Sequence, residues 1–217
     1  VYVFSTAAAP GSPNTTRTNL AITNSVLADN RTEVGAGGDV GTGGGGGGLR
    51  VNGMTANVSH TTIANNSFDA NLFFGEAILI QNDGGVIPTV LNLTNSIVAN
   101  HKSVNGKALT VFNGATANLA NNIFFGNANN ANVVPLGGGP NSTNPGVING
   151  AATNLTGNPL FTAPGAPTSD YTIQAGSAAV NAAVGSSAAV DLANRPRAGT
   201  PDVGAYELGS PNTLPAV

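Results

Sequence analysis

The sequence lacks the residues on which several kinds of function depend. It contains no cysteine and no tryptophan, and only 8% of its 217 residues are charged. Without cysteine the chain forms no disulfide and offers no thiolate as metal ligand or nucleophile. Its seven Lys and Arg residues are scattered and its formal net charge is −3, so no basic face for nucleic acid is expected. No run of 18 apolar residues is present, so we expect no membrane insertion by this chain.

The abundant residues indicate a folded chain built of strands. Hydrophobic residues make up 41% of the sequence, which also contains 30 glycines and is rich in Asn, Thr, Ser and Ala. Helical periodicity is absent, and short runs of alternating apolar and polar residues end in turns rich in Asn. Composition and pattern together predict an all-β protein.

Two families of segments recur along the first part of the chain. Strand-like segments at 19–30, 57–66, 92–100 and 118–127 can be laid over one another, and shorter apolar segments at 1–4, 49–51, 78–80 and 109–111 lie between them. Asn-Gly or Asn-Asp-Gly turns follow most of the shorter segments and return about every 30 residues, whereas hairpins return about every 8 to 12. Intervals of this length are typical of a solenoid.

The repeat predicts a right-handed parallel β-helix of the pectate-lyase-like kind, in which like residues stack from coil to coil. We expect two ladders, an internal aliphatic one and one of hydrogen-bonded turn amides. Their predicted members are Val26, Ile63, Ile97 and Ile123 for the first and Asn30, Asn66, Asn100 and Asn127 for the second.

The coils are expected to span residues 1–132, with a Gly-rich insertion at 31–48, and an irregular Pro- and Gly-rich coil and cap segment to span 133–217. The glycine run that ends at Gly48 lacks the Lys-Ser or Lys-Thr pair and the helix start of a phosphate-binding loop. We therefore interpret the insertion as a surface loop.

The C-terminal part carries the most distinctive motifs. They are Asn158-Pro-Leu-Phe161, Asp170-Tyr171, Ala175-Gly-Ser177, Asp191, Arg195-Pro196 and Asp202-Val-Gly-Ala-Tyr-Glu207. In this order they closely resemble the end of bacterial right-handed parallel β-helix proteins of the choice-of-anchor Q type. The resemblance implies secretion to the cell surface, with a separate anchor after the solenoid. Residues 210–217 carry no apolar tail or sorting motif, so we do not expect this chain to attach itself.

The polar residues of these motifs are predicted to form a structural cap over the exposed end of the last coil. The cap residues are Asp191, Arg195, Asp202, Tyr206 and Glu207, with Asp191 expected to pair with Arg195 or Arg197. The alternative is that Asp191, Asp202 and Glu207 ligate Ca²⁺, but their spacing matches no calcium loop. No other cofactor and no metal site is expected.

Catalysis has to be weighed because the same fold carries polysaccharide lyases and hydrolases. Such chemistry needs carboxylates that converge on one face. The acidic residues of the coils fall in turns or loops of different coils, at Asp29, Glu33, Asp39, Asp69, Glu76 and Asp83. His60 and His101 stand alone in the pattern, which favours surface or ladder positions over a general base. We therefore predict no catalytic residues.

Three functional hypotheses follow. The first is a secreted structural or adhesive cell-surface protein that self-associates, end to end into filaments, or joins a larger surface assembly through the edge formed by Val1, Tyr2, Val3 and Phe4. The second is a lyase or glycoside hydrolase that acts on acidic polysaccharide. The third is a carbohydrate-binding module, although the chain offers only three tyrosines and no tryptophan for stacking on sugars. The predicted partners are further copies, other surface proteins or a polysaccharide.

Overall fold

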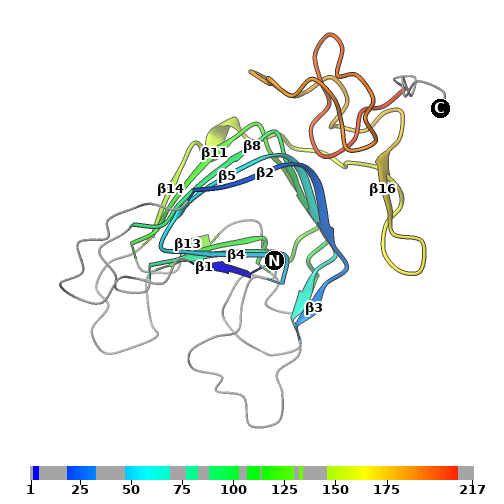
Figure 1. Ribbon diagram of the computed structural model, residues 1–217. Helices are drawn as coiled ribbons and strands as arrows, with labels where there is room; N and C mark the ends of the chain where they lie inside the picture. The colour runs from blue at the N-terminus through cyan, green and yellow to red at the C-terminus, as the bar shows by residue number, and fades with distance from the viewer. Residues whose placement is uncertain are drawn as a thin grey trace.

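The computed structural model describes residues 2–4, 19–32, 47–68, 77–82, 88–102, 107–112, 114–129, 132–133 and 146–209. Within these residues the chain is all-β, with one short 3-10 helix, η1 (Ala151–Thr153), and no α-helix. Its strands run parallel in a curled wall, as the sequence predicts, and a C-terminal segment lies against one side of that wall (Figure 1).

Two parallel sheets face each other in this wall. Sheet A has the order β1-β4-β7-β10-β13, and sheet B has the order β12-β9-β5-β8-β11-β14 with β2 paired to β5. The strands of sheet A are β1 (Tyr2–Phe4), β4 (Leu49–Asn52), β7 (Ile78–Gln81), β10 (Leu109–Phe112) and β13 (Asn132–Val133). Those of sheet B are β2 (Asn19–Ala28), β5 (Thr55–Ala64), β8 (Val90–Thr94), β9 (Ile97–Ala99), β11 (Thr116–Ala120), β12 (Ile123–Phe125) and β14 (Val147–Asn149).

The chain alternates between the sheets, so each sheet A strand and the sheet B strands that follow it make one repeat. In the part of the chain that the structure describes there are five such repeats, which contain β1 and β2, then β4 and β5, then β7 to β9, then β10 to β12, and finally β13 and β14. A further pair, β3 (Arg31–Thr32) with β6 (Ser67–Phe68), joins the first two repeats. The repeats extend beyond the predicted boundary at residue 132, because β14 pairs in register with β11.

A sharp corner divides the sheet B part of each of the first four repeats into two halves. The corner residues have left-handed backbones, with φ of 49° at Asn24, 44° at His60, 47° at Asn95 and 54° at Asn121. Asn adopts this conformation at little cost, which explains its recurrence here. As a result the ten-residue β5 pairs with β8 before the corner and with β9 after it.

The main core lies between the two sheets. Side chains alternate along each strand, and every second one points inward to meet the same kind of residue in the next repeat, as in the column Leu49, Ile78 and Leu109. Each of these three side chains is fully buried, which contributes about 1.5–3 kcal/mol relative to exposure.

The predicted aliphatic ladder is wrong by one residue in the second repeat. Thr62, not Ile63, pairs with Val26 and Ile97, while Ile63 pairs with Leu27 and Val98. A shift of one residue moves a side chain to the other face of the sheet, so Ile63 belongs to the core between the sheets and Ile97 to a second cluster outside sheet B. Both faces of this half of the sheet are buried, so the hydrophobic pattern alone does not specify the register.

The amide ladder at the turns exists with one member exchanged. Asn30 donates to Asn66 Oδ1 at 2.8 Å, Asn66 Nδ2 lies 3.3 Å from His101 Nε2, and His101 Nδ1 lies 2.9 Å from Asn127 Oδ1. Asn100, the predicted third member, instead occupies the preceding left-handed position with φ of 63°. His101 is therefore the ladder residue of the third repeat.

The C-terminal segment packs on the outer side of sheet B. It contains the antiparallel pair β15 (Phe161–Ala163) and β16 (Asp170–Ile173), and it covers the second cluster with Phe161, Tyr171 and Val203 over Ile97 and Ile123. It thus lies along the side of the stack of repeats (Figure 1), not over the end of the last coil, where we expected the cap. After the corner, side chains such as Ile97 and Ile123 point away from the core between the sheets, and the C-terminal segment buries them.

Candidate functional site

The charged residues of the C-terminal segment hold it in its own fold and against the first repeat. Arg197, 9% exposed, donates to Glu207 Oε2 at 2.8 Å, to the carbonyls of Asp202 and Gly204, and to Asn24 Oδ1 at 3.1 Å. Burial lowers the pKa of Arg197 and raises the pKa of Glu207. The network therefore needs both partners, because either one alone would be a buried unpaired charge.

Asp191 and Asp202 organise the loops around this pair. Asp191 forms an ion pair with Arg195 at 2.8 Å, as expected from the sequence, and also accepts from the backbone N–H of Glu207. Asp202 accepts from the N–H groups of Asn181 and Leu208 at 2.6 Å each. The five predicted cap residues thus lie close together, with the Arg195 guanidinium 5.9 Å from the centre of the Tyr206 ring.

The carboxylates of Asp191, Asp202 and Glu207 each accept hydrogen bonds from protein N–H groups. At least one oxygen of each of the three has such a donor within 3.0 Å. Among the residues that the structure describes, no group of three or more His, Asp or Glu side chains could hold a metal ion.

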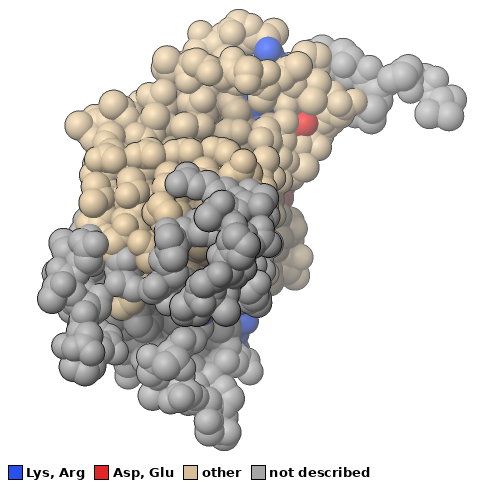
Figure 2. Space-filling model, turned by 60° about the vertical axis from the view of Figure 1, so that its left-hand side comes forward, with Lys and Arg blue, Asp and Glu red and all other residues tan. Residues whose placement is uncertain are grey.

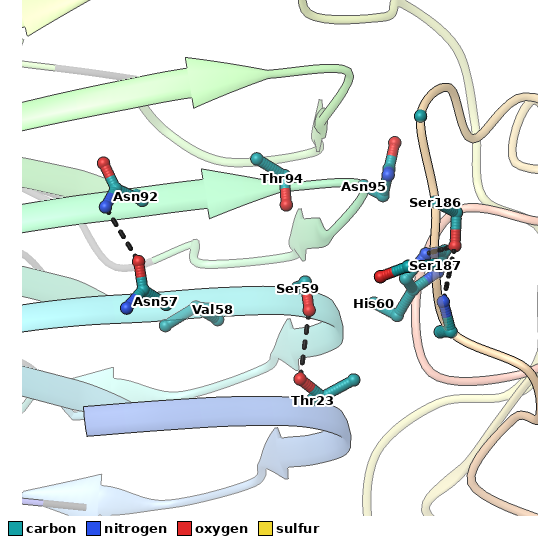
Figure 3. A pocket seen from close by; sticks show the side chains of 12 residues that line it. Thr23, Asn57, Val58, Ser59, His60, Asn92, Thr94, Asn95, Ser186 and Ser187 are labelled. Atoms are coloured by element: carbon teal, nitrogen blue, oxygen red, sulfur yellow. Dashed lines mark hydrogen bonds between the residues drawn. The ribbon is translucent and has the colours of Figure 1, made fainter. Parts of the chain in front are cut away.

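A groove of about 490 Å³ lies between the outer face of sheet B and the loop at 185–188 of the C-terminal segment (Figure 3). Its lining is free of Asp, Glu, Lys and Arg. The lining residues are Thr23, Asn57, Val58, Ser59, His60, Asn92, Thr94, Asn95, Gly185, Ser186, Ser187 and Ala188.

The floor of the groove consists of two columns of neutral polar side chains, one on the first three repeats and one that begins at the second repeat. One column contains Thr23, Ser59 and Thr94 in register, with Thr23 Oγ1 and Ser59 Oγ 3.1 Å apart. In the other, Asn92 donates to Asn57 at 2.8 Å. The second column continues beyond the groove along the stack, because Asn118 donates to Asn92 and Asn149 to Asn118.

His60 joins the floor to the loop. Its Nδ1 lies 3.2 Å from the carbonyl oxygen of Asp202 and its Nε2 lies 2.6 Å from Ser186 Oγ. A carbonyl only accepts, so Nδ1 carries the hydrogen and Nε2 accepts from the Ser186 hydroxyl. Burial, reinforced by the charge of Arg197, lowers the pKa of His60 to about 4, so the ring is neutral at pH 7.

Asn95 forms the second attachment of the loop. Its side chain donates to the carbonyl of Val184 and accepts from the N–H of the same residue, both at 3.1 Å. The loop is therefore bonded to the corner residues of two successive repeats. This arrangement fixes one wall of the groove.

The contact between Ser186 and His60 resembles the pairing of a nucleophile with its base. The ring is held by a backbone carbonyl, however, and an imidazole with a pKa of about 4 is a weak base. Ser186 Oγ also accepts from the N–H of Ala188, which ties it into its own turn. The contact is best explained as an attachment of the loop to the sheet.

The other residues singled out from the sequence lie elsewhere. His101 is fully buried in the amide ladder, and Asp29 accepts from Ser169 and Tyr171. Of the predicted edge, Tyr2–Phe4 forms β1 and pairs with β4, whereas Val1 lies outside the described residues. The remaining predicted coil acids also lie outside them, namely Glu33, Asp39, Asp69, Glu76 and Asp83.

Sequence reasoning missed the groove and its Asn column. The signal was present, because Asn57, Asn92 and Asn118 each begin one of the aligned segments. The loop at 185–188 gave no such signal, because nothing in the pattern places Ser186 beside His60, 126 residues away.

Comparison with models of known families, with curated proteins and with solved structures finds no match to this chain. In the part of the chain that the structure describes, no helix has the length and hydrophobicity needed to cross a membrane.

Proposed function

We propose that this chain is a right-handed parallel β-helix that acts as a non-catalytic structural or adhesive protein outside the cell, at the cell surface. Parallel strands that return once per repeat to the same two sheets support the helix. The right hand is supported by the rule that about 98% of parallel crossovers are right-handed. The motifs shared with choice-of-anchor Q proteins support the location.

The observation that carries this proposal is where the charged and the neutral polar side chains lie. In the C-terminal segment, Arg195 forms an ion pair with Asp191 and Arg197 with Glu207. The outer face of sheet B instead presents stacked neutral amides and hydroxyls, and the described surface in Figure 2 is almost entirely uncharged. Such a face is suited to adhesion and stacking, and within the described residues it presents no converging acid and base.

The outer edge of β2 supports self-association. Within the described residues, β2 pairs only with β5. The N–H of Val90 donates to the carbonyl of Met54, so it points toward the preceding repeat. Asn92, two residues further along the same strand, points its N–H the same way, and Asn92 is in register with Asn57 and, in β2, with Ala21. The N–H of Ala21 therefore faces away from β5. A strand of a second copy can pair with this edge.

Replacement of Ala21 tests this assembly. Ala21→Pro removes an edge donor without removing a bond to β5, whereas Ala21→Thr keeps the donor and favours strand. We expect the wild type and Ala21→Thr to form oligomers at high concentration in sedimentation velocity, and Ala21→Pro to sediment as a monomer of unchanged circular dichroism. A wild type that stays monomeric at every concentration contradicts self-association.

The competing hypothesis is a lyase or hydrolase that acts on acidic polysaccharide. Incubation of the protein with polygalacturonate distinguishes the two. New reducing ends or unsaturated uronide absorbance would overturn the non-catalytic function, and we expect neither.

A further inference from the structure

The groove between sheet B and the loop at 185–188 has the dimensions of a ligand site. Its volume of about 490 Å³ falls within the range of about 300 to 1,000 Å³ typical of such sites. The loop is held by His60 and Asn95, so the groove is already formed in the free protein. The loop therefore does not have to be ordered when a ligand enters the groove.

The floor leaves hydrogen-bonding capacity unused. A side-chain amide has two N–H donors and an oxygen with two lone pairs. Asn92 uses one N–H toward Asn57 and one lone pair toward Asn118. Each Asn side chain of the column therefore keeps at least one N–H donor and one oxygen lone pair side by side. This pair of groups matches two neighbouring hydroxyl groups of a ligand.

The floor is also periodic. Neighbouring strands of a sheet lie about 4.8 Å apart, so the same side-chain groups recur at this interval along the stack. The Asn column extends beyond the groove to Asn118 and Asn149. A polymer that lies along the stack would meet equivalent groups at successive units.

Charge decides the class of polymer. The groove is lined without Asp, Glu, Lys or Arg, and His60 is neutral at pH 7. An ionised ligand would lose hydration without gaining an ion pair, whereas a neutral hydroxylated ligand exchanges hydrogen bonds with water for equivalent ones.

From these observations we infer that the groove binds an uncharged polysaccharide, along the Asn column, as the ligand of the adhesive function. The inference rests on the proposed function and supplies its partner class. Without aromatic stacking each sugar unit contributes little, so affinity depends on the number of units bound.

The test uses the whole protein and defined probes. Binding of neutral glucan, mannan and xylan oligosaccharides of two to eight units, and of oligogalacturonate of equal length, is measured by titration calorimetry. We expect one or more neutral series to bind with affinity that rises with length, and oligogalacturonate to bind at least tenfold more weakly. No binding of any neutral series, or tighter binding of oligogalacturonate, overturns the inference.

A matched pair of variants locates the site. Asn92→Ala removes the central rung of the floor and should weaken binding of the best neutral probe about tenfold, as expected for the loss of two hydrogen bonds. Asn129→Ala, at an exposed position outside the groove, should bind like the wild type. Urea unfolding of both variants controls for stability, and equal affinity of folded Asn92→Ala and wild type overturns the site.

The outcomes separate this inference from the proposed function. Cleavage of a neutral probe would end the non-catalytic proposal and keep the groove as a carbohydrate site. Absence of binding would remove the groove's ligand while the edge of β2 remains testable through Ala21.

Discussion

Individual residues of this fold are selected by hydrogen-bond direction as much as by size. In the amide ladder, Asn66 Nδ2 donates to His101 Nε2, and His101 Nδ1 donates to Asn127 Oδ1, which also accepts from the backbone N–H of His101. The ladder therefore requires the neutral ring with its hydrogen on Nδ1. Protonation of Nε2 would set two donors against each other.

Burial accordingly lowers the pKa of His101 to about 4, from 6.5 in the unfolded chain. The unfolded state takes up a proton first as the pH falls, so stability is complete above pH 6.5 and decreases down to pH 4. His101 alone should cost about 3 kcal/mol over this range. His60, whose pKa is also lowered to about 4, acts in the same direction.

Replacement of His101 with Asn, the residue of the neighbouring rungs, should preserve the ladder and remove this dependence. Urea unfolding at pH 7.5 and pH 4 is expected to show a smaller loss of stability for His101→Asn than for the wild type, with similar stability of both at pH 7.5. An equal loss in the two proteins would show that His101 does not carry the effect.

The attachment of the C-terminal segment to sheet B depends on the close approach of the Gly204 backbone to Ile97 and Asn95. Its φ is 95°, and a Cβ there would lie 2.6 Å from Ile97 Cδ1. The N–H of Gly204 meanwhile donates to the carbonyl of Asn95 at 2.9 Å, so the backbone cannot retreat without breaking this bond. A side chain at this position would therefore be strained by its positive φ and would push Ile97 out of its place in the cluster.

Gly204→Ala should therefore loosen the segment, while Gly199→Ala serves as its control. Gly199 also has a positive φ, 69°, but its Cβ would meet nothing within 4 Å. Both variants carry a backbone cost of about 1 kcal/mol, and only Gly204→Ala adds the clash. Hydrogen exchange over residues 158–209 should rise in Gly204→Ala and stay near the wild type in Gly199→Ala. Equal exchange in both variants would contradict the importance of the contact.

For the whole molecule, the sequence predicts the all-β class and the parallel strands because they depend on local turns and short-range alternation. The Asn residues at corners such as Asn95 carry this information. The register of Ile63 could not be predicted, because both faces of its half-strand are buried. The place of the C-terminal segment was also inaccessible, since contacts such as that between Arg197 and Asn24 join residues far apart in the sequence.

Stacked repeats ordinarily contact only their neighbours, so such proteins can lose end repeats one at a time. Here one segment bonds directly to three successive corners, at Asn24 through Val190, at His60 through Asp202, and at Asn95 through Val184. The first repeat cannot fray without first releasing a segment that the second and third repeats also hold. The first three repeats and the C-terminal segment should thus melt as one cooperative unit, in a single calorimetric transition. A stack of repeats without such a segment would instead melt gradually from its ends.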